Sequence, residues 1–439
     1  MARVIPFKGL RYNTKKFADL NEVTAPPYDI IKPDKQDFLY GQSPYNIIRA
    51  DFGKVFDGDS EENNCYTRAS EALKMWINDG SLIFEERPAF YIYEQQFSIG
   101  EIQKSIKGII SLVQLEDFAN GVIFPHEETI SKAKTDRFNL MTATEANLSP
   151  IYSIYPDDDA EIETIISANS DDEPDISFTT DEGILQNIWI VTDEEVTAAI
   201  TRLFEEKPLF IADGHHRYET ALNYRNSRRE ADGTEGEKPY DYTMMLLVSM
   251  ENSGLMVFPT HRLIRGVEKY DEVSLIGYLT EEFNVSKIFL TDGNYAEVIT
   301  EKLSEAAEDE KTFALYTGDE YYYLLKLKDL AIADELNQDH SIVYRRLDAT
   351  VLHSIILERY LGIDKENMAE QKSLVYTRDI EEAIDEVQNG DFQCAFLINA
   401  SRVSEIKEIS AQHEKMPQKS TYFWPKPVTG IVMNSFAAE

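Results

Sequence analysis

The segment PLFIADGHHRYETALNYR, residues 208–225, decides the fold expected for this chain. It opens with the apolar run Leu209–Ala212, which is too short for a helix and lies between a proline and a glycine. Such a run is typical of a buried strand. Helical spacing follows it at Tyr218, Ala221, Leu222 and Arg225. A helix is therefore expected to begin near His215, and the polar residues 213–217 lie on a strand-to-helix turn at the end of a sheet.

Strand and helix patterns alternate along the rest of the chain. Short apolar runs predict strands at 89–99, 107–115, 150–155, 187–193, 321–327 and 392–398. Helical spacing predicts helices at 66–80, 193–206 and 348–362. Asp193 is a plausible cap for the second of these helices. Two strand-like runs at 241–250 and 255–259, joined by Asn-Ser-Gly, predict a hairpin. The alternation favours an α/β to α+β protein with mixed sheets and several domains.

The chain has 439 residues, enough for two or three domains. The sequence divides into predicted segments 1–150, 151–330 and 331–439. No apolar run approaches the roughly 18–20 residues that cross a bilayer, and the start lacks a signal-peptide pattern. We therefore expect a cytoplasmic protein without a membrane partner.

The net charge of −36 comes from 79 acidic and 43 basic residues. Such a charge repels phosphate polymers, and the sequence shows no basic stripe, so a nucleic-acid partner is not expected. Cys65 and Cys394 are predicted as buried core thiols, because their separation fits neither a metal site nor a disulfide framework. His353 lies in an apolar helical stripe and is predicted as a hydrogen-bonded core histidine.

The turn at 213–217 combines groups that bind an anion. The first backbone N–H groups of a helix have no partner inside the helix, and this end carries about half a positive charge. Gly214 lets the backbone approach a ligand, and Arg217 offers a planar fork suited to phosphate oxygens. His215 and His216 can exchange a proton near neutral pH. Asp213 can cap the helix or help hold magnesium with bound phosphates.

Two further segments gather side chains of the same kind. FPHEETISKAKTDR, residues 124–137, offers acid–base or metal-binding groups at His126 and Glu127. The same segment offers phosphate- or carboxylate-binding groups at Lys134 and Arg137. MPQKSTYFWPKP, residues 416–427, places aromatic rings beside a second set of anion-binding candidates, Lys419, Ser420, Thr421 and Lys426.

Each of these three groups also has a structural explanation. In the turn, the histidines can cap the helix while Arg217 pairs with an acid such as Glu219. The segment 124–137 can be a polar loop followed by a helix start. The segment 416–427 can be a C-terminal strand with core aromatics and solvated lysines. All three explanations stay open on the sequence alone.

Several of these motifs resemble those of one known family. The quoted segments 124–137 and 416–427, together with APPYDII at 25–31, IADGHHRYETAL at 211–222 and LDATVLHSIILE at 347–358, are similar to recurring segments of domain-of-unknown-function family 1015. The resemblance extends over nearly the whole chain. It implies no activity, because that family is uncharacterised.

At a greater distance, the strand, Asp-Gly-His-His-Arg turn and helix resemble the phosphate-binding turn of the ParB/sulfiredoxin superfamily. Gly214 and Arg217 match its Gly-x-x-Arg form, and the other turn residues match variants that begin with Asp-Gly. The resemblance implies a nucleotide-phosphate site. That superfamily includes DNA-partition CTPases, ATP-using reductases and kinases acting on free serine. No cysteine adjoins the turn and no helix-turn-helix or basic face is present, so sulfur chemistry and chromosome segregation are not implied.

We therefore expect a nucleotide-dependent phosphotransferase or phosphohydrolase that acts on a small metabolite, with a serine- or phosphoserine-like molecule as the first acceptor to test. The expected ligand is ATP or ADP, or alternatively CTP, with Mg. The catalytic candidates are Asp213, His215, His216, His126 and Glu127. The binding candidates are Gly214, Arg217, Lys134, Arg137, Lys419, Ser420, Thr421 and Lys426.

Two alternative functions stay open. One is a nucleotide- or metabolite-binding switch without turnover. The other is a metal-dependent hydrolase that uses His126, Glu127, His215 and His216. A protein-bound transition metal is not expected, because no third ligand residue can be identified in the sequence.

Overall fold

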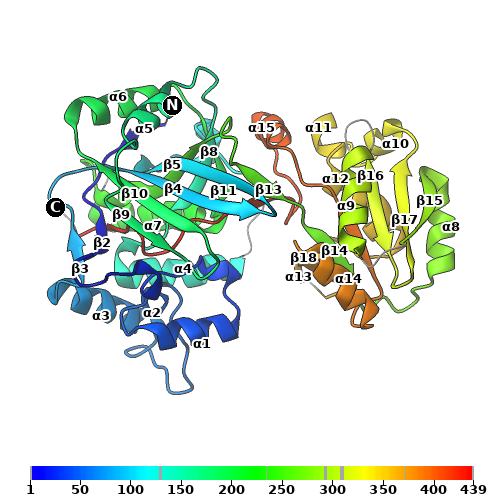
Figure 1. The fold of residues 1–439 in the computed structure, drawn as a ribbon, viewed down its shortest axis with the longest axis horizontal. Coiled ribbons are helices and arrows are strands. Elements are labelled where there is room, and N and C mark those ends of the chain that lie inside the picture. Colours follow the sequence, from blue (N-terminus) through cyan, green and yellow to red (C-terminus); the bar gives the residue numbers. More distant parts are fainter. Residues whose placement is uncertain are drawn as a thin grey trace. The chain divides into compact units, whose positions relative to one another are not determined.

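The computed structural model describes residues 2–127, 131–233, 235–290, 294–306, 311–370 and 372–437. The chain forms two compact units (Figure 1). Unit 1 comprises Met1–Pro125, Thr129–Met256 and Pro425–Glu439, and unit 2 comprises His126–Glu128 and Val257–Trp424. The segment boundaries expected at 150 and 330 each fall inside a unit. The reason is that one sheet takes strands from both sides of residue 150, and a second sheet takes strands from both sides of residue 330.

Unit 1 is built from strands and helices drawn mainly from the first half of the chain. Its strands are β1 (Val4–Ile5), β2 (Leu10–Tyr12), β3 (Leu82–Phe84), β4 (Phe90–Ile99), β5 (Ile102–Gln114), β6 (Ile123–Phe124), β7 (Ala146–Asn147), β8 (Ile151–Tyr155), β9 (Ile176–Thr179), β10 (Leu185–Val191), β11 (Leu209–Asp213), β12 (Tyr242–Ser249) and β21 (Asn434–Ser435). Its α-helices are α1 (Pro33–Gln42), α2 (Ile48–Asp51), α3 (Cys65–Asn78), α4 (Ser131–Thr144), α5 (Glu161–Ala168), α6 (Glu194–Phe204) and α7 (His215–Asp232). Its 3-10 helices are η1 (Leu20–Glu22), η2 (Tyr28–Ile30), η3 (Phe118–Asn120) and η4 (Pro239–Asp241).

A nine-stranded mixed sheet forms the centre of unit 1. Its order is β6-β11-β8-β12-β5-β4-β10-β9, with β1 paired to β5. The β11–β6 and β12–β8 pairs are parallel, and the other pairs are antiparallel. Figure 1 shows α5 and α6 on one side of this sheet and α1, α2 and α3 on the other. Helix α4 packs on both α3 and α7, so the helix that follows the turn has helical neighbours as well as the sheet.

The segment that decided the expected fold forms the elements it predicted. Residues 209–212 are buried in β11, and α7 begins at His215 and runs for 18 residues. Elsewhere, Asp193 caps α6, since its side chain accepts from the N–H groups of Glu195 and Val196. The predicted helix at 66–80 corresponds to α3. The mixed α/β architecture with several sheets is therefore confirmed.

Unit 2 is built from the segment between Val257 and Trp424. Its strands are β13 (Met256–Phe258), β14 (His261–Ile264), β15 (Phe283–Phe289), β16 (Thr312–Tyr316), β17 (Tyr321–Leu327), β18 (Leu374–Thr377), β19 (Cys394–Ile398) and β20 (Tyr422–Trp424). Its helices are α8 (Glu272–Glu282), α9 (Tyr295–Ala306), α10 (Leu330–Asp334), α11 (Ile342–Arg345), α12 (Asp348–Val351), the π-helix η5 (Leu352–Tyr360), α13 (Lys365–Glu370), α14 (Ile380–Gln388) and α15 (Val403–Ala411).

The main sheet of unit 2 is antiparallel, with the order β15-β17-β16-β19-β14-β18. Alternate residues of its strands face two separate cores, as the period of two in a strand requires. Along β16, Phe313 and Leu315 pack with α8 and η5, whereas Ala314 and Tyr316 pack with α9 and α14. Unit 2 is thus a sheet between two layers of helices.

Three local expectations differ from the structure. The hairpin at 241–259 is wrong: β13 pairs with β20, because β12 already has β5 and β8 as neighbours. The helix expected at 348–362 begins as α12 and continues as the π-helix η5 before the chain turns at Gly362. Cys394 is buried as expected, whereas Cys65 is only half-buried.

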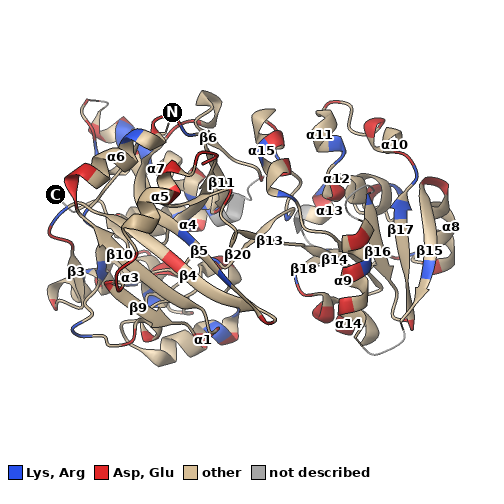
Figure 2. Ribbon diagram, turned by 45° about the horizontal axis from the view of Figure 1, so that its top comes forward, with Lys and Arg blue, Asp and Glu red and all other residues tan. Residues whose placement is uncertain are grey.

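In Figure 2, acidic residues mark parts of helices such as α9 and α14 in red, and most of these residues are exposed. None of the helices in the described ranges combines the length and apolar character that crossing a bilayer requires.

Candidate functional site

The turn between β11 and α7 depends on glycine. Gly214 has φ +95°, a left-handed conformation that side-chain-bearing residues rarely adopt. A Cβ at this position would lie 2.9 Å from Nε and 3.0 Å from Nη2 of Arg217. The arginine side chain therefore folds back over the glycine, and its guanidinium lies at the turn.

Much of the hydrogen-bonding capacity of Arg217 is used inside the protein. The residue is 9% exposed. Its Nη1 donates to the Pro150 carbonyl at 2.6 Å and to Ser149 Oγ at 3.1 Å, and its Nη2 donates to Asp213 Oδ2 at 2.5 Å. Its Nε–H donates no hydrogen bond within the described residues. The acid that pairs with Arg217 is therefore Asp213, not Glu219, and the guanidinium fixes the turn.

Lys426 reaches the same carboxylate from the C-terminal segment. Its Nζ lies 2.7 Å from Asp213 Oδ1 and also donates to Asp29 Oδ2, which η2 supplies. The lysine side chain is 6% exposed, against 18% for Asp213 and 38% for Asp29. Two cations and two carboxylates thus meet at the end of β11, and their formal charges cancel.

Electrostatics keep this cluster ionised. Burial opposes the charged form of Asp213, but Lys426 and Arg217 outweigh it and hold the pKa of the Asp213 carboxyl far below its ordinary value. Burial likewise opposes the charge of Lys426, and the carboxylates of Asp213 and Asp29 outweigh it, so the pKa of Lys426 is raised. Asp213 is consequently an anion at neutral pH and a poor general base.

A second buried arginine lies nearby on α4. Arg137 donates to the carbonyl of Asp51 at 2.8 Å and to Oδ2 of Asp136 at 2.7 Å, and its Cζ lies 4.1 Å from the ring centroid of Tyr28. Burial raises the pKa of Tyr28 to about 12, although Arg137 and Arg217 both lower it. Tyr28 is therefore a neutral phenol at physiological pH.

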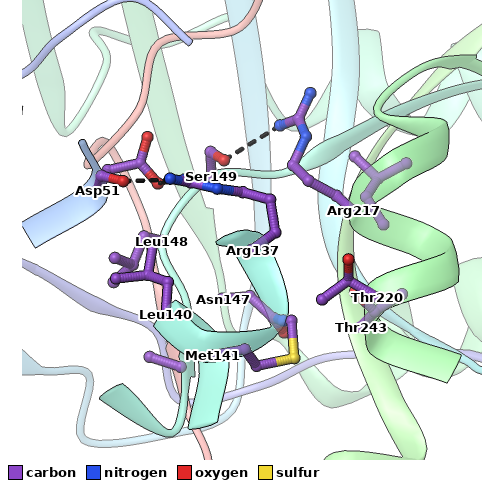
Figure 3. Close-up of a pocket in the computed structure, with 12 residues that line it drawn as sticks. Asp51, Arg137, Leu140, Met141, Asn147, Leu148, Ser149, Arg217, Thr220 and Thr243 are labelled. Atoms are coloured by element: carbon purple, nitrogen blue, oxygen red, sulfur yellow. Dashed lines mark hydrogen bonds and ion pairs between the residues drawn. The ribbon is translucent and has the colours of Figure 1, made fainter. Parts of the chain in front are cut away.

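A small cavity of about 40 Å³ lies between α4 and α7. Figure 3 shows Arg137 extending from α4 toward Asp51 and Arg217 extending from α7 toward Ser149. Asp51 Oδ2 and Thr220 Oγ1 are buried in the cavity wall and have no hydrogen-bond partner among the residues that the structure describes. Burial raises the pKa of Asp51. A cavity of this size and polarity has room for water or for one small polar group.

The other candidates of unit 1 surround this cluster. Lys134 Nζ of α4 lies 2.8 Å from Glu219 Oε2 of α7, which links the two helices. His215 is buried, and its positive form lowers the pKa of Asp213; His216 is half-buried. Unit 1 therefore gathers a larger set of the predicted residues: Lys134, Arg137, Asp213, Gly214, His215, His216, Arg217 and Lys426.

The remaining candidates gather in unit 2. His126 Nε2 lies 2.8 Å from Thr421 Oγ1, and the Glu127 carboxylate accepts from the Lys419 N–H at 3.0 Å. Ser420 Oγ donates to the Pro417 carbonyl. The segment 124–137 is thus divided, since His126 and Glu127 join the loop at 416–421 while Lys134 and Arg137 belong to unit 1.

This division bears on metal binding. The four residues of the hydrolase alternative are split between the units, His126 and Glu127 in unit 2 and His215 and His216 in unit 1. Within the described residues, no group of three or more His, Cys, Asp or Glu is arranged to hold a metal ion.

Sequence reasoning missed several residues of the cluster. Asp29 and Tyr28 belong to the quoted segment APPYDII, which carried the family resemblance but no assigned role. Asp51 and Ser149 carry no local signal, because only the fold brings them to Arg137 and Arg217. One signal for Asp29 was available in the sequence. It is a charged residue in a segment that recurs in the family, and no structural role explained it.

The fold and site define an α/β protein of two units, in which unit 1 encloses a charged centre at a strand-to-helix turn. The chain belongs to the family described as Protein of unknown function (DUF1015), whose model matches residues 4–350. No curated protein matches the chain.

Several solved structures are similar to this chain at low identity. A free serine kinase in complex with AMP matches with 14% identity and a TM-score of 0.35, covering 73% of this chain and 92% of that chain. A conserved hypothetical protein from Pyrococcus furiosus matches with 14% identity and a TM-score of 0.34, covering 74% and 94%. SbnI with a C-terminal truncation from Staphylococcus aureus matches with 12% identity and a TM-score of 0.32, covering 73% and 87%. At TM-scores this low, the likeness carries no information on the chemistry of this chain.

Proposed function

We propose that unit 1 binds the phosphates of a nucleotide at the turn 214–217 and that the protein transfers a phosphoryl group to a small metabolite or to water. The observation that carries this proposal is that Arg217 and Lys426 both contact the Asp213 carboxylate, beside the N-terminus of α7. Helix N-termini attract phosphate, and two fixed cations beside one suit phosphoryl transfer, which depends mainly on positioning and charge stabilisation.

The charge balance of the cluster favours a nucleotide that arrives with magnesium. The positive charges of Lys426 and Arg217 are already balanced by Asp29 and Asp213. Mg²⁺ takes one or two carboxylates together with phosphate oxygens and water, so the more exposed Asp29 and its neighbour Asp213 fit that donor set. The ion would supply the positive charge that phosphates need. On the protein side, the Arg217 Nε–H and the second N–H of Nη2 are the donors without a partner among the described residues.

The other groups then take distinct roles. Asp213 stays ionised and orients Arg217 and Lys426, so it is a positioning residue. His215 and His216 are the groups that can exchange a proton with an acceptor hydroxyl near neutral pH. Serine and phosphoserine are the first acceptors to test.

The direct test is an assay of purified protein with ATP, ADP or CTP and Mg²⁺, with and without serine. Phosphate release or a phosphorylated acceptor supports the enzyme, and Lys426→Met should abolish it. Lys74→Met, at an exposed position of α3, serves as the matched control. Binding without turnover would point to the switch, and absence of nucleotide binding by calorimetry would overturn the proposal.

A second measurement addresses Arg217. If its Nε–H donates to a phosphate, Arg217→Ala should weaken nucleotide binding by roughly 1.5–3 kcal/mol. Arg217→Lys keeps the charge but loses the fork, so it should restore only part of the affinity. Equal affinities for wild type and both variants would show that Arg217 acts on the turn alone.

A further inference from the structure

Arg262 of β14 carries a buried guanidinium whose acceptors are all neutral. The residue is 0% exposed. Its Nη1 donates to the Thr260 carbonyl, its Nε lies 3.4 Å from His353 Nε2, and its Nη2 lies 3.4 Å from the Lys419 carbonyl. No carboxylate of the described residues forms an ion pair with it. Asp348, whose charge acts on Arg262 electrostatically, is paired with Lys311 at 2.7 Å.

A buried charge without a counter-ion is unusual, because leaving water is costly unless an opposite charge compensates. The Nε–Nη2 edge of a guanidinium is suited to two parallel hydrogen bonds with a carboxylate or phosphate. In Arg262 this edge meets two neutral acceptors at 3.4 Å each, longer than the usual hydrogen-bond length of about 2.9–3.0 Å. The two N–H groups of this edge therefore make only weak hydrogen bonds.

The two histidines next to Arg262 are held neutral. His353 accepts from Arg262 and so lacks a proton on Nε2, in line with a pKa that burial and Arg262 hold well below its ordinary value. Burial and Arg262 also lower the pKa of His261 to about 4, and Asp379 opposes this only in part. The ring centroid of Tyr376 lies 5.5 Å from the Arg262 Cζ. Neither histidine adds a charge beside this guanidinium, and Asp348, the carboxylate whose charge acts on it, is engaged with Lys311.

The acceptor at the edge comes from an unusual loop. Lys419 has φ +57°, a left-handed conformation that residues with a side chain rarely adopt. The Lys419 N–H donates to the Glu127 carboxylate, and Ser401 Oγ donates to the Ser420 carbonyl at 2.8 Å. Opposite this loop, His353 lies in the π-helix η5, a rare element that often marks functional sites.

We propose that Arg262 is the anchor of a second binding site, within unit 2, for the carboxylate or phosphate group of a small metabolite. The oxyanion takes the places of the Lys419 carbonyl and the His353 ring nitrogen at the Nε–Nη2 edge, and residues 419–421 form the rim of the site. This inference goes beyond the phosphoryl-transfer proposal, because it rests on unit 2 alone.

The test follows an NMR resonance of Arg262 itself, so that phosphate bound in unit 1 does not affect the measurement. Arginine is labelled with ¹⁵N in the full chain, and the Arg262 Nε–H resonance is assigned by its loss in Arg262→Lys. Inorganic phosphate and acetate are then titrated separately, which distinguishes the two oxyanions. A saturable shift of this resonance is expected with at least one of them. An unmoved resonance with both ions would overturn the proposal.

Thermal unfolding supplies the second readout. At about ten times its dissociation constant, the bound ion should raise the unfolding temperature of wild-type unit 2 by about 3 °C. Arg262→Met should lose this rise, and Arg265→Met, at an exposed arginine, should keep it. If Arg262→Met does not fold, Arg262→Lys carries the test, since loss of the fork should weaken binding by roughly tenfold. An equal rise in wild type and the Arg262 variants would contradict the site.

Discussion

The Nζ of Lys426 lies 2.7 Å from Oδ1 of Asp213, although one residue ends a strand in the middle of the chain and the other lies near its end. This pair joins the returning C-terminal segment to the turn of unit 1. Because both groups are mostly buried, each needs the other to remain charged. The predictions that follow concern this pair, its turn and two other buried groups.

Gly214→Ala should destabilise unit 1 by about 1–3 kcal/mol, because alanine is strained at positive φ and its Cβ would contact the Arg217 guanidinium. Urea unfolding followed by fluorescence measures the free energy. Gly41→Ala is the matched control: it lies in α1, and a Cβ there meets nothing within 4 Å. That variant should be unchanged or more stable, by about 0.5–1 kcal/mol. A Gly214→Ala protein as stable as the Gly41→Ala protein would contradict the need for glycine.

Lys426→Met should cost about 3–5 kcal/mol, since it leaves the Asp213 and Asp29 carboxylates without their cation. Adding Asp213→Asn should recover part of this loss, so that the double variant is more stable than the sum of the single effects by roughly 1–3 kcal/mol. A double-mutant cycle of unfolding free energies measures the coupling. Lys74→Met should change stability by no more than about 0.5 kcal/mol. Strictly additive changes in unfolding free energy would mean that the interaction between Lys426 and Asp213 does not stabilise the protein.

Asp51→Asn should be more stable than wild type at pH 7. Burial raises the pKa of Asp51 in the folded protein, so its protonated form favours folding. That stability is fully present below the ordinary aspartate pKa of about 3.9 and is lost as the pH rises through the folded pKa. Asparagine resembles the protonated acid and keeps an acceptor for Arg137. Unfolding free energies of both proteins from pH 3 to pH 7 should therefore diverge as the pH rises; a constant difference would argue against this cause.

His261→Asn should flatten the acid side of the stability profile of unit 2. Burial and Arg262 lower the pKa of His261 to about 4, whereas an unfolded histidine titrates near 6.5. Wild type should consequently lose about 3 kcal/mol as the pH falls from about 6.5 to about 4. Asparagine can still accept from the Ile398 N–H, which His261 Nδ1 accepts at 3.2 Å. The same substitution at exposed His413 is the control, and identical slopes in all three proteins would disprove the assignment.

Much of the fold could be predicted because the local signals were strong. The apolar run at 209–212 and the spacing after it defined β11 and α7, and Asp193 marked the start of α6. The hairpin at 241–259 failed for a long-range reason. The sequence cannot show that β5 and β8 occupy both edges of β12, which leaves β13 to pair with β20.

The candidate site was predictable only in part. Asp213, Gly214 and Arg217 are neighbours in sequence, so their shared turn was visible. Their partners Asp29 and Ser149 come from other elements, and no periodicity connects them to the turn. Arg262 shows the same limit, because what makes it unusual is the set of neutral acceptors that the fold of unit 2 places around it.

The last stretch of unit 1, Pro425–Glu439, is separated from the rest of the unit by nearly all of unit 2. During synthesis, the ribosome releases β11 and α7 long before it makes Lys426. Until then Asp213 has Arg217 as its cation but lacks Lys426, and the inserted unit has time to fold first. Completion of the charged centre is thus a late step of biogenesis, dependent on the arrival of the segment after Trp424.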